Sequence, residues 1–282
     1  MSATTSGRAT SGRPSRAALA AAGTLGALAL AGLLAPLVAP YDPARQFDLV
    51  ALQNRAPSAA HLLGTDPFSR DVLSRAVYAA RASLGVAALG ALVAAAVGAL
   101  WGGAAGALGG TAERVLMRTV DVVLGVPRVL LLLAVVALWG AVPAPALALV
   151  LGLTAWPATA RLVRARLAQV RRAEFVEAAR ALGASPARVL FRHLPPHAAG
   201  TLAVSATLLF GELLALEAGL SFLGLGVRPP AASWGSMVQD GTPYVATAWW
   251  TALVPTACIV ASVLSASVLG DHLAARFRRG GE

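Results

Sequence analysis

The chain has 282 residues, of which 57% are hydrophobic and 13% are charged, and its mean hydropathy is +0.69. These values argue against a soluble protein and are typical of an all-α protein that crosses a membrane several times. The net charge is +10, but the arginines cluster between hydrophobic runs, which favours contact with anionic lipid over nucleic acid. All 23 basic residues are arginine, so the chain lacks the lysine that a Walker A phosphate loop requires. If the protein works with ATP, another subunit must bind it.

The first expected membrane span is residues 17–39, which follow a Ser/Thr/Gly/Arg-rich segment, residues 1–16, expected to be a disordered cytoplasmic tail. An apolar run of about 20 residues has the length that spans a bilayer. A cleaved signal peptide is the alternative, but its apolar core is normally about 7–15 residues long. We therefore favour a retained anchor. Arg8, Arg13 and Arg16 precede the run and favour a cytoplasmic N-terminus.

Residues 40–80 are expected to form an external segment, because they are polar and their Arg and Asp residues nearly balance. Residues 64–71 predict a turn, followed by an amphipathic helix that leads to Tyr78. The acidic side chains in this segment raise the alternative of a metal site. Helix caps and surface Arg–Asp pairs are the favoured interpretation. The acids are Asp42, Asp48, Asp66 and Asp71.

The second and third spans are expected at residues 83–106 and 115–141, with a short cytoplasmic turn at 113–118. Glycines recur at every fourth position from Gly98 through Gly102 and Gly106 to Gly110. Such spacing lets another helix approach closely and favours a packed bundle. The third span is long enough to tilt or to kink at Pro127.

Four residues of the third span, three of them charged, would share one helix face at i, i+3, i+7 and i+10, namely Arg118, Asp121, Gly125 and Arg128. Charged residues inside a membrane usually face a bundle interior or a water-filled path. Asp121 and Arg128 are therefore candidates for the lining of a translocation pathway. The alternative is a surface pair between Arg118 and Asp121, with Arg128 reaching the membrane surface or pairing elsewhere.

The fourth span, residues 146–160, leads into an arginine-rich segment, residues 161–197. This segment cannot lie in hydrocarbon, because each arginine at mid-membrane costs about 2.5–3.5 kcal/mol. Apolar residues recur at helical spacing up to Leu182, and Gly183 then suits the left-handed end of a helix. Ser185 and Pro186 suit the start of a second helix. We predict a cytoplasmic helix–turn–helix that serves as a docking surface.

The fifth span begins near residue 199 and carries Glu212 and Glu217, which are costly in a membrane unless they face polar surroundings. They are further candidates for the pathway or its gate. A polar outer loop then reaches residue 248, and Trp249 and Trp250 mark the outer membrane interface. The sixth span runs to about residue 269, and Cys258 within it is expected to have a packing role. Residues 275–282 are expected to form a cytoplasmic tail. The distribution of arginines along the chain favours six spans with both termini inside.

Three sequence blocks resemble one family. Glu177, Ala178 and Ala179, with Gly183 after three further residues, resemble the EAA loop of binding-protein-dependent ABC importer permeases. Residues 64–84 and 217–237 are similar to the C-type permease subunit of dipeptide, oligopeptide and nickel importers. Ser69 replaces a usual glycine in the first of these two blocks, and His193 and Pro195 replace the usual Ile and Leu after the EAA loop. The resemblance covers nearly all of the chain after residue 17.

The resemblance implies a type I ABC importer permease fold over residues 81–274, with a coupling loop at 161–197. It implies a second, B-type permease subunit, two cytoplasmic ATPase subunits that bind ATP and magnesium, and an extracytoplasmic substrate-binding protein. The chain itself would hold no cofactor and would lie in the inner membrane, in contact with lipid. The expected substrates are di- or oligopeptides, with nickel or another small solute as the alternative. The residues expected to couple to the ATPase are Glu177, Ala178, Ala179, Gly183, Ser185 and Pro186.

A membrane-embedded enzyme and a receptor or scaffold are the rival classes. The enzyme would need catalytic residues, but neither an HExxH nor a GxSxG motif occurs. His193 and His197 are four residues apart, yet Pro195 and Pro196 would break a helix between them, so we expect no metal site there. A receptor would differ from a transporter by lacking ATPase partners.

Overall fold

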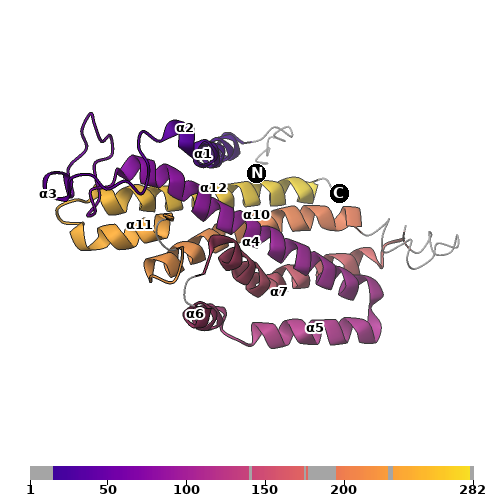
Figure 1. Cartoon of the computed structure of the whole chain (residues 1–282). Helices are drawn as coiled ribbons and strands as arrows, with labels where there is room; N and C mark the ends of the chain where they lie inside the picture. Colours follow the sequence, from indigo (N-terminus) through magenta and orange to yellow (C-terminus); the bar gives the residue numbers. More distant parts are fainter. Residues whose placement is uncertain (1–14, 140–141, 175, 177–194, 228–230, 280–282) are drawn as a thin grey trace, which may run out of the picture.

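The computed structural model describes residues 15–139, 142–174, 176, 195–227 and 231–279, and its regular elements in these ranges are helices. The all-α prediction is therefore confirmed. Figure 1 shows the helices in chain order. They are α1 (Arg16–Leu33), α2 (Ala35–Val38), α3 (Leu49–Leu52), α4 (Val72–Leu108), α5 (Gly110–Leu124), α6 (Arg128–Trp139), α7 (Ala144–Val170), α10 (Pro195–Phe222), α11 (Trp234–Gly241), the 3-10 helix η2 (Thr242–Tyr244) and α12 (Trp250–Arg279).

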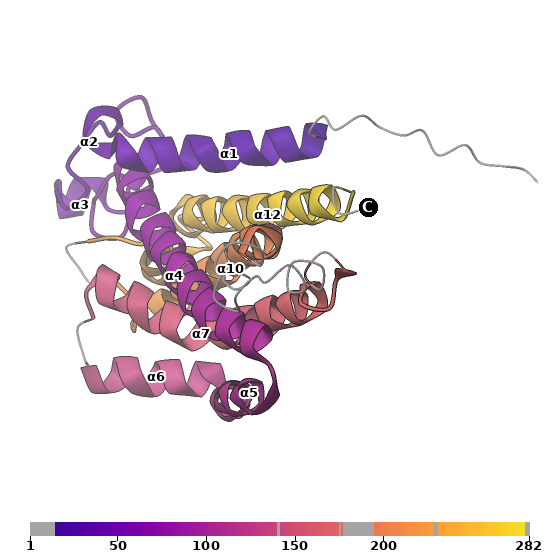
Figure 2. The ribbon, with the colours of Figure 1, turned by 90° about the vertical axis from the view of Figure 1, so that its right-hand side faces the viewer.

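Five of the described helices, α1, α4, α7, α10 and α12, are long and apolar enough to cross a membrane. The helices α5 and α6 satisfy the same criteria only as a pair, which would make six spans. In Figure 2, α1, α12, α10, α7 and α6 lie one below another, and α4 runs diagonally from the level of α1 to the level of α5. The core between them is apolar and includes the fully buried Leu132, Leu147, Leu151, Leu213 and Leu214.

The third span expected at residues 115–141 is broken near Pro127, where a kink was predicted. α5 ends at Leu124, α6 begins at Arg128, and their axes differ by 71°. Pro127 lies in the break, where it has no N–H to donate and disfavours helical backbone at Val126. Figure 2 shows the result, with α5 viewed along its axis and α6 from the side. The prediction of a turn at residues 113–118 is wrong, because these residues lie inside α5.

Three of the four spaced glycines sit where α4 packs against α7, as predicted. A Cβ atom at Gly98 would lie 2.6 Å from the Cβ of Thr159, and one at Gly106 would lie 2.9 Å from the carbonyl oxygen of Arg164. A Cβ at Gly102 would overlap the backbone of Ala160. The fourth glycine, Gly110, is different: it begins α5 with φ +60° and faces open space.

Several helix boundaries differ from the expected ones. α7 continues to Val170, so the first ten residues of the arginine-rich segment extend a membrane helix. α12 likewise continues past residue 269 to Arg279. The loop expected before residue 248 contains α11, which Ser233 caps through a reciprocal pair of hydrogen bonds with Ser236. Helical periodicity did not reveal α11 because it is only eight residues long.

We predict that Gly102→Leu lowers the thermal unfolding midpoint of the detergent-purified protein, because its Cβ would lie 2.8 Å from the Cα of Ala160. Overpacking of this kind typically costs about 1–3 kcal/mol. Gly103→Leu is the matched control, since the nearest atom to a Cβ there is 4.0 Å away. Equal losses in the two variants would contradict the proposed role of the glycines.

Candidate functional site

The structure brings two of the four candidate pathway residues together. Arg128, at the start of α6, forms an ion pair with Glu212 in the middle of α10. The Nε atom of Arg128 donates to Thr154 Oγ1 of α7 at 3.2 Å, and its Nη2 atom donates to the Leu151 carbonyl oxygen at 3.4 Å. Three helices therefore converge on one guanidinium group.

Glu212 occupies the middle of a helix face that the described part of the chain leaves uncovered. Its side chain is 54% exposed, whereas that of Arg128 is 22% exposed. The uncovered face comprises positions i, i+4, i+7, i+11 and i+14 of α10, namely Leu208, Glu212, Ala215, Gly219 and Phe222. The opposite face packs into the core through Leu209, Leu213 and Leu214. A charged pair on such a face is costly against lipid and requires protein or water beside it.

Asp121 lies elsewhere and has a partner that was not predicted. Its Oδ1 atom accepts a hydrogen bond from Nη2 of Arg161 at 2.7 Å, and both side chains are about half exposed. Glu113 forms a similar ion pair with Arg164. These two pairs connect α5 to the end of α7. The proposed surface pair between Arg118 and Asp121 is replaced by this interhelical pair, and the shared face with Arg128 is lost at the break before α6.

Glu217 is on α10 with Glu212 but faces the interior of this chain. Its side chain is fully buried, and its Oε1 atom accepts a hydrogen bond from Ser221 Oγ at 2.7 Å. Its Oε2 atom has no hydrogen-bond partner among the described residues. The structure therefore separates Glu217 from the Arg128–Glu212 pair, and its role in gating stays a prediction.

A second polar cluster lies between the 40–71 segment and α11. The sequence predicted Arg–Asp pairs within the segment but not the contribution of Asp240 from α11. Asp66 accepts from Arg70 Nε at 2.6 Å and also pairs with Arg75, while Asp240 accepts from Arg70 Nη2 at 2.8 Å and from Arg75 Nη2 at 3.1 Å. Asp66 and Arg75 are buried, so the expected surface pairs are in fact largely enclosed. Asp240 is 165 residues from Arg75 in the chain, and no local spacing could indicate this contact.

Two other acids of this segment, Asp48 and Asp71, cap helices, as the favoured interpretation held. Asp71 caps α4 by accepting from the Ser74 amide at 2.8 Å, and Asp48 caps α3. His61 Nδ1 lies 2.9 Å from Asp71 Oδ1. Among the residues that the structure describes, no group of three or more His, Cys, Asp or Glu side chains could hold a metal ion.

The tryptophans expected at the membrane interface have two different environments. Trp249 is 55% exposed, whereas Trp250 is buried and its indole N–H donates to the Thr65 carbonyl oxygen at 3.1 Å. Gly64 permits this contact, since a Cβ there would lie 2.6 Å from Trp250 Nε1. Trp250 therefore joins α12 to the 40–71 segment.

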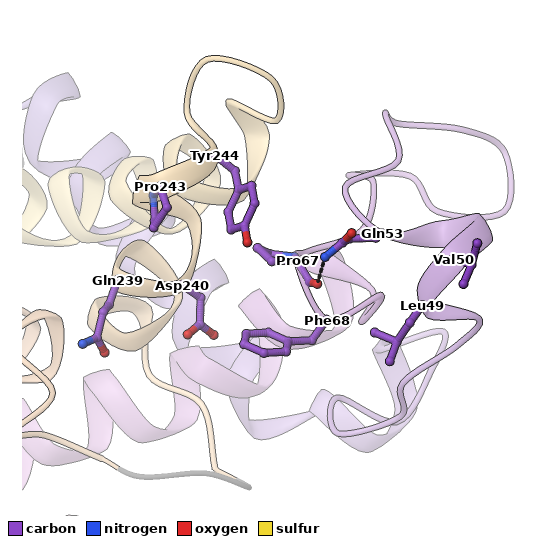
Figure 3. A pocket seen from close by; sticks show the side chains of 9 residues that line it. All are labelled: Leu49, Val50, Gln53, Pro67, Phe68, Gln239, Asp240, Pro243 and Tyr244. Atoms are coloured by element: carbon purple, nitrogen blue, oxygen red, sulfur yellow. Dashed lines mark hydrogen bonds between the residues drawn. The ribbon is translucent and has the colours of Figure 1, made fainter.

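An open pocket of about 920 Å³ lies beside this polar cluster. Figure 3 shows residues of the 40–71 segment on one side of the pocket and residues of α11 and η2 on the other. The amide of Gln53 donates to the Pro67 carbonyl oxygen at 2.9 Å along its wall. The lining residues are Leu49, Val50, Gln53, Pro67, Phe68, Gln239, Asp240, Pro243 and Tyr244.

The predicted coupling residues Glu177, Ala178, Ala179, Gly183, Ser185 and Pro186 lie outside the described residues. The structure describes the two flanking helices instead. α7 ends at Val170, with two ion pairs to α5 within its last ten residues, and α10 begins at Pro195.

Residues 97–279 match the sequence profile of the family described as binding-protein-dependent transport system inner membrane component. The chain belongs to this family. The matched region contains Asp121, Arg128, Glu212 and Glu217, and its long apolar helices are those of a multi-pass membrane protein. A member of this family is a transport component that works with other subunits of a binding-protein-dependent system.

Named relatives cover most of the chain. A putative peptide permease protein of Brucella suis is 41% identical over 265 residues, which is 92% of this chain and 85% of the relative. The dipeptide transport system permease protein DppC of Escherichia coli K12 is 46% identical over 246 residues, 86% of this chain and 81% of the relative. The di/tripeptide transport system permease protein DppC of Pseudomonas aeruginosa is 36% identical over 248 residues, 86% of this chain and 80% of the relative.

We predict that Asp66→Asn accelerates tryptic cleavage after the exposed Arg45 and Arg55, because it removes the carboxylate that faces Arg70 and the buried Arg75. Removing one partner of a buried ion pair costs about 3–5 kcal/mol. The measurement is the cleavage rate of the purified protein. Asp42→Asn is the control, since Asp42 is exposed and its carboxylate accepts only from the amide of Ala44 among the described contacts. Equal acceleration in both variants would refute the role of the cluster.

Proposed function

We propose that the chain is one of two permease subunits of an ABC importer that moves di- or oligopeptides across the cytoplasmic membrane. The observation that carries this proposal is the similarity, over more than four-fifths of each chain, to proteins named as peptide and dipeptide permeases. The uncovered face of α10 supports it as well. A face with a charged pair at its centre suits contact with a second permease subunit around a polar path.

The other proposed partners are those that the family resemblance implies. ATP and magnesium would be bound by two cytoplasmic ATPase subunits, and this agrees with the lack of a Walker A lysine in this chain. These subunits would dock on the arginine-rich segment, residues 161–197. The arginines of that segment and of the two tails favour a cytoplasmic location for both termini. The 40–71 segment and α11 would then face the extracytoplasmic binding protein.

The C-terminal part of α7 suggests how movement of the ATPase subunits could be transmitted to the translocation pathway. The segment that would dock on the ATPase directly continues α7, and α7 also supplies Thr154 to Arg128. Two ion pairs connect the end of α7 to α5, which precedes α6 and Arg128 in the chain. A displacement of α7 would therefore move Thr154 directly and Arg128 through α5 and α6. A flexible linker in place of α7 would not transmit the displacement.

Uptake by the complete transporter tests the function. The chain would be reconstituted in liposomes with its cognate permease, ATPase and binding-protein subunits. We expect ATP-dependent uptake of a labelled dipeptide that stops when the binding protein is omitted. Uptake of labelled nickel without uptake of any peptide would overturn the peptide proposal. Uptake of neither peptide nor nickel would overturn both the peptide proposal and the nickel alternative.

We predict that Gly183→Pro inserts normally into the membrane but hydrolyses ATP without peptide uptake, because proline cannot adopt the left-handed backbone expected at this helix end. ATP hydrolysis and uptake would be measured on the same proteoliposomes. Gly183→Asn is the matched control, since asparagine tolerates that backbone and should keep the two activities coupled. Full uptake with wild-type stimulation of ATP hydrolysis in Gly183→Pro would contradict the coupling role.

A further inference from the structure

We infer that the Arg128–Glu212 pair binds the two charged ends of a peptide during its passage, with Arg128 taking the terminal carboxylate and Glu212 the terminal ammonium. This inference rests on the proposed function and specifies the chemistry by which the permease itself would recognise its substrate. It begins from the geometry of the pair. The two opposite charges come from different helices, and their contact lies on the uncovered face of α10.

The guanidinium of Arg128 is held so that one nitrogen can exchange its partner. Nε donates to Thr154 Oγ1 and Nη2 donates to the Leu151 carbonyl oxygen, while Nη1 contacts Glu212. Both fixed contacts are to α7, so they would persist when Glu212 moves away. The guanidinium would then already be oriented, with its Nη1 donor free to bind a peptide carboxylate. A charge-assisted hydrogen bond of this kind is among the strongest in proteins.

Charge balance selects the class of ligand. Binding a peptide with free termini breaks one ion pair and forms two, and the site stays neutral before and after. A metal cation or a simple anion would instead compensate only one of the two protein charges and leave the other exposed in a region of low dielectric. Uncompensated charge is costly there. The pair therefore favours zwitterions over singly charged solutes.

The surroundings suit recognition of termini and tolerance of peptide side chains. The neighbours of Glu212 on the uncovered face of α10 are apolar or small, namely Leu208, Ala215, Gly219 and Phe222. A Cβ at Gly219 would meet no atom within 4 Å. The charges of an extended dipeptide are separated by at most about 7 Å, from a length of about 3.3–3.6 Å per residue. Because α7 holds the guanidinium of Arg128, rotamer changes of the Glu212 side chain would supply this separation.

Equilibrium binding to the complete transporter tests this inference without the binding protein, whose own selectivity would otherwise intervene. The assembled permease and ATPase subunits would be held in nanodiscs without nucleotide and titrated with a labelled dipeptide. We expect saturable binding that unlabelled dipeptide displaces. The N-acetylated dipeptide, the C-amidated dipeptide and nickel ions should each compete at least tenfold less well. These measurements use the wild-type protein and do not depend on the folding of any variant.

Variants then assign the recognition to the pair. Glu212→Gln should weaken dipeptide binding at least tenfold and abolish the preference for dipeptide over its N-acetylated form. Glu113→Gln is the matched control, because it breaks another interhelical Arg–Glu pair and should leave that preference unchanged. Absent binding to the wild type, equal competition by the N-acetylated dipeptide, or an unchanged preference in Glu212→Gln would each overturn the inference. The proposed function would survive any of these results if proteoliposomes still take up peptide.

Discussion

The close contact between α4 and α7 is the interaction on which the other features of the structure depend. Lipid offers no hydrophobic drive for two helices to associate, so the contact relies on van der Waals packing of backbones that approach closely. Gly98, Gly102 and Gly106 permit this approach on α4, and Gly152 permits it on α7, where a Cβ would lie 2.6 Å from the Gly90 carbonyl oxygen. Because the glycines fix the register of α7, they also fix the positions of its polar groups. Thr154 meets Arg128, and Arg161 and Arg164 meet the acids of α5.

Charge pairing across helices is the second constraint. Three ion pairs each join two helices, so each charge is neutralised by a protein group and none is left unpaired against lipid. The pairs are Arg128–Glu212, Arg161–Asp121 and Arg164–Glu113. The pairs differ in what surrounds them. The two pairs of α5 strengthen a connection between neighbouring helices, whereas the Arg128–Glu212 pair lies on a face that the described chain does not cover. The same electrostatic rule thus produces a structural contact in one place and an exchangeable one in another.

The parts of the fold that depend on local pattern could be predicted from sequence. Span length, the spaced glycines of α4 and the Asp caps each follow from neighbouring residues, and the structure confirms them. Contacts between distant residues could not be predicted in this way. Glu212 is 84 residues from Arg128, and helical spacing alone assigned Arg128 to the wrong face beside Asp121. Pro127 was recognised as a possible kink, but only the structure shows a 71° break that turns Arg128 toward α7 and α10.

Glu212 and Glu217 lie on the same helix but differ in whether a ligand can reach them. Five residues at about 100° each place them about 140° apart around α10. Glu212 consequently faces outward to a cation that a ligand could replace, while Glu217 points inward to Ser221 and is fully buried. A ligand could reach Glu217 only if the helices that enclose it separated, since its carboxylate has no accessible side. Substrate recognition would therefore belong to the outward acid, and any part that Glu217 takes in gating would have to act through movement of the helices packed around it.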